Sequence, residues 1–72
     1  MVIVQSPLMR DFIISLLDGK TIDSITFRLH RQEDMSLYFD HDGDAEAAEK
    51  IAKKTIKESE YGPALFFRVT HE

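Results

Sequence analysis

Two stretches in which apolar and polar residues alternate set the strongest constraint on how this chain folds. The first lies within Thr21–Arg31 and the second runs from Met35 to Asp40, with the polar break Gln32-Glu33-Asp34 between them. Side chains of a strand point alternately to opposite faces, so a period of two predicts strands with one buried face. The short break predicts that the two strands pair as an antiparallel hairpin.

The position of the break also predicts the register of this hairpin. If the hairpin closes over the three polar residues, Phe27 faces Phe39 on one side of the sheet, and Arg28 faces Tyr38 on the other. Apolar residues then meet apolar residues across the pair. We therefore expect odd-numbered side chains from Ile25 to Phe39 to turn toward the core and even-numbered ones to stay outside.

The segment before the hairpin predicts a strand and a helix. The apolar residues Met1–Val4 are typical of a strand that is buried on both faces. Ser6-Pro7 is typical of a helix start, with the Ser6 hydroxyl as the cap. Apolar residues then recur at spacings of three and four, and Gly19 is expected to end the helix.

The segment after the hairpin predicts a second helix and a last strand. The acidic turn Asp40–Asp44 supplies either Asp42 or Asp44 as a helix cap. An apolar stripe with helical spacing follows, opposite a face of Glu and Lys residues, and Tyr61-Gly62-Pro63 ends the helix. Alternation resumes from Leu65 to Thr70.

These elements predict a single domain over residues 1–72. The order is strand, helix, strand, strand, helix, strand, which favours an α+β two-layer sandwich: an antiparallel four-stranded sheet with two helices on one face, in the ferredoxin-like βαββαβ order. In that order the short first strand is central. If it does not pair, the alternative is a three-stranded sheet with two helices. The expected core consists of Val2, Val4, Phe12, Ile13, Leu16, Leu17, Ile25, Phe27, Leu29, Leu37, Phe39, Ile51, Ile56, Leu65, Phe67 and Val69.

Composition narrows the classes of function. The formal net charge is −4, which argues against a general nucleic-acid coat or a polybasic membrane binder. The chain has no cysteine, so disulfides, thiolate metal sites and cysteine nucleophiles are excluded. No apolar run approaches the roughly 20 residues of a membrane span. By elimination we expect a cytoplasmic protein without a membrane partner.

No motif predicts catalysis or a metal centre. Asp40, Asp42 and Asp44 have the spacing of calcium-loop ligands, but Ala45 stands where that loop needs glycine and Ile51 where it needs a bidentate glutamate. We expect this stretch to be a turn, with weak binding of a divalent cation as the alternative. The three histidines lack ligand spacing, and no serine lies in a nucleophile motif. The sequence therefore predicts no enzyme, no catalytic residue, no cofactor and no metal site.

The outer face of the predicted sheet is the candidate site. It carries more aromatic and arginine residues than contact with water requires, and both types are favoured at protein interfaces. We expect a small interaction or regulatory module that binds another protein or a second copy through this face. The alternative is single-stranded nucleic acid, which such a face binds by stacking bases and tracking phosphates. The predicted partner-binding residues are Arg28, Tyr38, Phe66 and Arg68.

Overall fold

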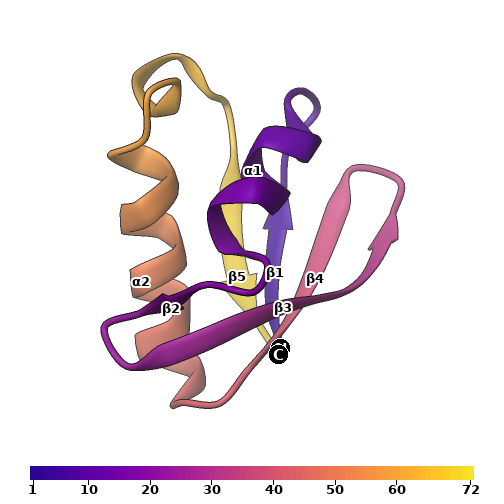
Figure 1. Ribbon diagram of the computed structural model, residues 1–72. Coiled ribbons are helices and arrows are strands. Elements are labelled where there is room, and N and C mark those ends of the chain that lie inside the picture. Colours follow the sequence, from indigo (N-terminus) through magenta and orange to yellow (C-terminus); the bar gives the residue numbers. More distant parts are fainter.

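The computed structural model describes residues 1–72 as a small α+β domain with two helices and one curled antiparallel sheet. The strand order is β2-β3-β4-β1-β5. Figure 1 shows β3 running obliquely to β1 and β5, which gives the sheet its curl. No helix is of a length and apolarity that would let it cross a membrane. The elements are β1 (Val2–Gln5), α1 (Arg10–Leu17), β2 (Thr21–Ile22), β3 (Ile25–Glu33), β4 (Ser36–His41), α2 (Ala45–Lys57), the 3-10 helix η1 (Gly62–Ala64) and β5 (Arg68–His71).

The short first strand lies inside the sheet. β1 pairs antiparallel with β4 on one side and with β5 on the other, so that Val4 has Leu37 and Val69 as its neighbours. The alternative of a three-stranded sheet without β1 is therefore wrong. The sheet nevertheless has five strands where four were expected.

The additional strand is β2, which pairs with the beginning of β3. Ile22 lies opposite Ile25, so only Asp23 and Ser24 form the connecting turn. Both turn residues have positive φ, 50° and 70°, as a type I′ hairpin turn requires. The segment expected to be one strand from Thr21 onward is thus a tight hairpin, and its turn contains no glycine to reveal it.

The register of the β3–β4 hairpin differs from the predicted one. Leu29 lies opposite Phe39, and Arg28 lies opposite Asp40 instead of Tyr38. The connecting turn is Asp34-Met35, with Asp34 at φ 52°. A bulge between Leu29 and Arg31 then places Arg31 opposite Tyr38. Up to Leu29 the pairing register differs from the predicted one by two residues, so each side chain still points to its predicted face. The bulge adds one further residue to β3, and from Arg31 to the end of β3 the side chains therefore point to the face opposite the predicted one.

Two of the four helix ends lie where the sequence predicts them. Gly19 follows the last turn of α1 with φ 73°, a conformation that glycine adopts without steric cost. The Asp44 side chain accepts a hydrogen bond from the Ala47 amide at 3.0 Å and so caps α2. α2 ends earlier than expected, at Lys57, and Gly62-Pro63 instead begin the 3-10 helix η1. The expected cap at Ser6 is wrong. α1 begins only at Arg10, after Met9, which has φ 60° and provides no side-chain cap.

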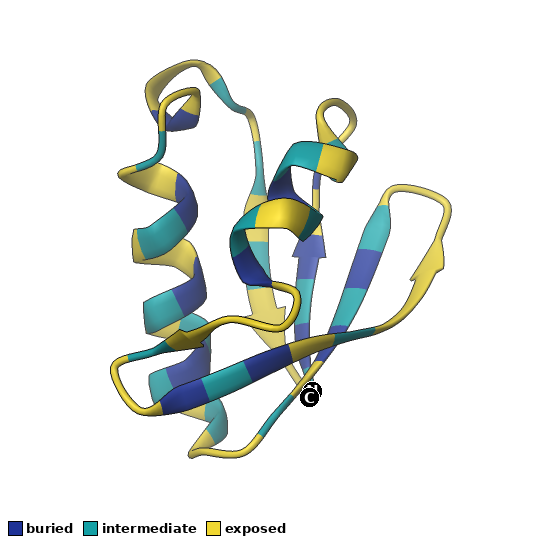
Figure 2. Ribbon diagram, viewed as in Figure 1, coloured by how far each residue is buried: buried dark blue, intermediate teal, exposed yellow.

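One apolar cluster on one face of the sheet holds the layers together. Figure 2 shows the buried bands of α1, α2 and the strands turned toward the same interior. Most of the expected core residues lie in this cluster or against it. Phe12 is the one expected core residue that lies neither in this cluster nor against it. Its ring packs edge-on against Tyr61 instead, with the ring centroids 4.9 Å apart. The fully buried Ala48 and Ala52 of α2 were not expected. The eleven buried core residues are Val2, Val4, Ile13, Leu17, Ile25, Phe27, Leu37, Phe39, Ala48, Ala52 and Ile56.

Candidate functional site: the outer face of the sheet

The face of the sheet that points away from both helices carries the candidate site. Alternate side chains of the strands point to it, because their neighbours point into the core. The strand registers align these side chains in rows across β3, β4, β1 and β5. We call this surface the outer face. Its middle row is Arg31, Tyr38, Ile3 and Thr70, and its end row is Glu33, Ser36, Gln5 and Arg68.

An isoleucine lies at the centre of the outer face. Val2 and Val4 of β1 are fully buried, whereas Ile3 between them is only partly buried. Tyr38, the neighbour of Ile3 in β4, is also partly buried. Open faces of antiparallel sheets usually carry polar side chains. Val2 and Val4 point to the same face, so β1 is fully buried on its core side only, and the expectation of burial on both faces is wrong at the partly buried Ile3 and the exposed Gln5.

An arginine covers the tyrosine ring in the middle row. The Arg31 guanidinium lies 4.0 Å from the centre of the Tyr38 ring, a distance typical of a cation–π contact. Arg31 also donates a hydrogen bond to the Glu33 carboxylate, which raises the pKa of the arginine. The bulge in β3 allows this contact with Tyr38, because without the extra residue the Arg31 side chain would point to the opposite face of the sheet.

Carboxylates offset much of the positive charge on the outer face. Arg31 pairs with Glu33, and His30 lies 3.3 Å from the Asp40 carboxylate. Arg28 lies opposite the same Asp40 in the strand register. The outer face is therefore mixed in charge, with Arg68 as its one arginine that has no carboxylate beside it.

A hollow of about 620 Å³ opens at the end row. It lies where β1 ends and where β4 and β5 begin, and Gln5, Ser36 and Arg68 contribute to its wall. Two strongly exposed apolar side chains line it as well: Phe66 is 86% exposed and Met35 is 54% exposed. The hollow thus joins the outer face to an apolar rim.

Ser6 holds together the three segments that form this rim. Its amide donates to the Met35 carbonyl at 3.0 Å, which ties the β1–α1 loop to the β3–β4 turn. Its hydroxyl donates to the Leu8 carbonyl at 2.6 Å and lies 3.5 Å from the Phe66 carbonyl. Ser6 is 1% exposed. Its function in the fold is therefore to join loops, in place of the helix cap expected from the sequence.

The four predicted partner-binding residues do not form one cluster. Phe66 and Arg68 share the hollow, and Tyr38 lies in the middle row. Arg28 lies toward the opposite end of the sheet, beside Asp40. Phe66 precedes β5 and belongs to no strand. The residues not predicted for this surface are Ile3, Gln5, Arg31, Glu33 and Met35.

The acidic turn keeps its carboxylates apart. Asp44 caps α2, the Asp42 carboxylate accepts from the Thr26 amide at 2.8 Å, and Asp40 pairs with His30. Each carboxylate thus has its own hydrogen-bonding or charged partner. No three His, Asp or Glu side chains converge anywhere in the chain.

No family model matches the chain, and neither a curated protein nor a solved structure matches it. Function is therefore inferred from the geometry of the outer face.

Proposed function

We propose that this chain is a small non-enzymatic interaction module whose outer face binds another protein. The observation that supports this most is the middle row, where Ile3 and Tyr38 lie side by side on a face that no helix covers. Burying such a pair against a partner stabilises a complex by removing apolar surface from water. The strongly exposed Phe66 beside the hollow adds an aromatic anchor of the kind that interfaces favour.

A protein partner fits this surface better than single-stranded nucleic acid. Base stacking needs an open ring face, and the Arg31 guanidinium already covers the Tyr38 ring. Phosphate binding needs arginines free of carboxylates, whereas Arg31 pairs with Glu33 and Arg28 lies opposite Asp40, which leaves Arg68 as the one arginine of this face available to a phosphate. The mixed charge of the outer face is instead typical of the polar surroundings of an apolar protein interface.

Site-specific photo-crosslinking tests this proposal. A photoreactive phenylalanine analogue replaces Phe66 at the rim of the hollow and, as the matched control, Tyr61, which packs against Phe12 away from the outer face. We expect one discrete protein adduct from position 66 in the cells that make this chain, lost when Tyr38→Ala is added. A nuclease-sensitive adduct would instead support the nucleic-acid alternative. Equal labelling from both positions, or none from position 66, would refute the assignment of the outer face.

We also propose that the architecture is a variant of the ferredoxin-like arrangement. In support of this, the four longer strands follow the order β3-β4-β1-β5, with the first strand of the chain between the last two. The two-residue strand β2 is then an addition at one edge. An experimental structure with β1 outside the middle of the sheet would contradict this grouping.

A further inference from the structure

The edge of the sheet formed by β5 is unpaired. β5 pairs only with β1, and beyond it lies no further strand. The Glu72 amide donates to the Met1 carbonyl at 3.1 Å, and antiparallel pairing alternates every second residue. The peptide groups of Thr70 and Arg68 therefore face β1, while those of Val69 and His71 point away from the sheet. These outward groups offer hydrogen bonds to a further strand.

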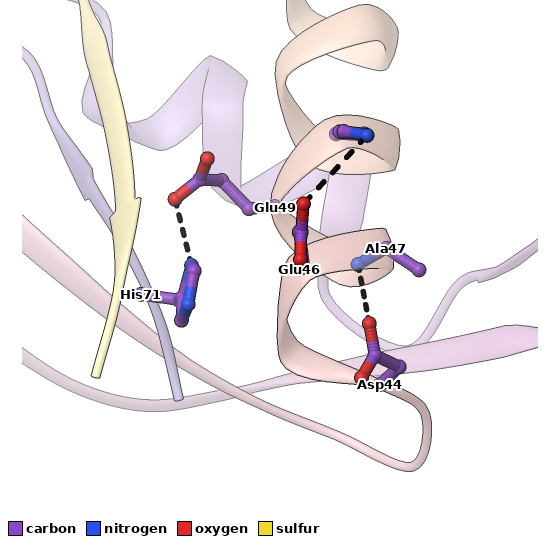
Figure 3. A network of polar contacts seen from close by, with 6 residues as sticks. Asp44, Glu46, Ala47, Glu49 and His71 are labelled. Atoms are coloured by element: carbon purple, nitrogen blue, oxygen red, sulfur yellow. Dashed lines mark hydrogen bonds and ion pairs between the residues drawn. The ribbon is translucent and has the colours of Figure 1, made fainter.

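The flank of α2 beside this edge carries two blocks of opposite charge. Figure 3 shows Glu49 reaching His71 of β5, with the Glu49 carboxylate 2.9 Å from the His71 ring, and Glu46 one turn earlier on the same helix. Glu46 also lies 3.9 Å from Lys50, but both side chains of this pair are largely exposed, so the Glu46 carboxylate stays open to a partner. Further along α2, Lys53 and Lys57 line a groove of about 710 Å³ against β5. Along the free edge the flank therefore changes from acidic beside His71 to basic beside Arg68.

We infer that a second copy of this chain pairs with β5 along its free edge, antiparallel and about a two-fold axis at Val69. The two-fold axis makes α2 of the second copy run in the opposite direction to α2 of the first. The acidic block of each α2, Glu46 and Glu49, then faces the basic block, Lys53 and Lys57, of the other copy. Both copies contribute the same residues to both halves of the contact, as an isologous dimer requires.

The order of charges favours a second copy over an unrelated peptide. An acidic strand at this edge meets Glu46 and Glu49, and a basic strand meets Lys53 and Lys57, so either one is repelled by half of the flank. A second copy in the antiparallel sense avoids both repulsions. It also overcomes an obstacle that a chain of net charge −4 otherwise presents to self-association.

This dimer is independent of the proposed function and leaves the outer face free. From the sequence alone, a second copy was expected to bind the outer face. The free edge of β5 and the charged flank of α2 favour binding beside β5 instead. Because the two-fold axis stands perpendicular to the sheet, the two outer faces lie side by side on one continuous sheet. Each dimer then offers its partner two copies of the middle row.

Sedimentation velocity of the full chain over a concentration series tests the inference. We expect a dimer in low salt that weakens as salt is added, because exposed charges are screened. Lys57→Glu reverses a charge in the groove, and Lys54→Glu makes the same change at a lysine that does not line it. We expect the dimer Kd to rise about tenfold or more with Lys57→Glu and to stay within about twofold with Lys54→Glu.

A mixing experiment gives an outcome that misfolding cannot imitate. Glu46→Lys and Lys57→Glu each put like charges opposite one another in their own homodimers. In the mixed dimer both contacts are attractive again, so we expect the two weakened variants to associate with each other more tightly than either does with itself. A chain that stays monomeric at every concentration overturns the inference. A dimer weakened equally by Lys54→Glu and Lys57→Glu, or variants that do not rescue each other, overturns its placement beside β5. None of these results bears on crosslinking at Phe66.

Discussion

Replacing Gly62 by alanine is expected to cost this chain a large part of its stability. Gly62 is buried where η1 turns back against the end of α2. A Cβ added there would lie 2.1 Å from the Lys57 carbonyl oxygen and 2.5 Å from the Ile56 carbonyl oxygen. Real Cβ contacts essentially never fall below 3.0 Å, and both obstacles are backbone atoms that no side-chain rotation can move. η1 must therefore shift away from α2, taking with it the segment that carries Leu65 and Phe67 against the core.

The size of the loss follows from the cost of overpacking a well-packed site, about 2 to 3 kcal/mol. A domain of 72 residues has a free energy of unfolding of about 4 to 11 kcal/mol. We therefore expect Tm to fall by roughly 10 to 20 °C, measured by circular dichroism with urea unfolding at 25 °C as a second measure.

Gly19→Ala is the matched control for this substitution. Gly19 has φ 73°, but a Cβ there meets nothing within 4 Å. Only backbone strain then opposes the alanine, at about 1 kcal/mol. If Gly62→Ala leaves the free energy of unfolding within about 0.5 kcal/mol of wild type, or if Gly19→Ala costs more, the close approach of η1 to α2 is wrong.

Three smaller changes test other local features by urea unfolding. Ser24→Gly should raise the free energy of unfolding by about 0.5 kcal/mol, because glycine relieves the positive φ of the β2–β3 turn at some entropic cost; a loss would contradict the type I′ turn. Ser6→Ala should lower it by about 1 kcal/mol through loss of the buried hydroxyl, and the same substitution at the exposed Ser15 should cost less. Asp44→Ala should cost about 1 kcal/mol as the loss of a helix cap, and a change below about 0.3 kcal/mol would show that the cap does not form.

Hydrophobic period was enough to predict the main elements of the fold. The two-residue period from Ile25 to Phe39 and the apolar stripe of α2 report which side chains are buried, and burial dominates the free energy of folding. β2 escaped prediction for a different reason. Its turn relies on Asp23 and Ser24 in a left-handed conformation that glycine usually takes, so residue type alone does not reveal it.

The candidate site was predicted less well than the fold, because it depends on register. Tyr38 was expected on the outer face, but its partner was taken to be Arg28 and is Arg31. A bulge changes register by one residue, and nothing in the residue types at His30 announces it. Ile3 was missed because an uninterrupted apolar strand does not indicate which of its residues lies on the open side. Phe66 was assigned to a strand that begins only at Arg68.

The single residue inserted at His30 divides β3 into two parts with different neighbours. Before it, Ile25 and Phe27 are anchored among the buried side chains of both layers. After it, every residue from His30 to Met35 is exposed, so this half of β3 forms an open edge beside β4, whose Leu37 opposite Gln32 stays fully buried and pairs with Val4 of β1. Segments with few buried contacts open at low free energy, so amide exchange should be fast at Gln32 and slow at Phe27. A partner that covers this half of β3 would then slow amide exchange there and leave the exchange of the buried half unchanged.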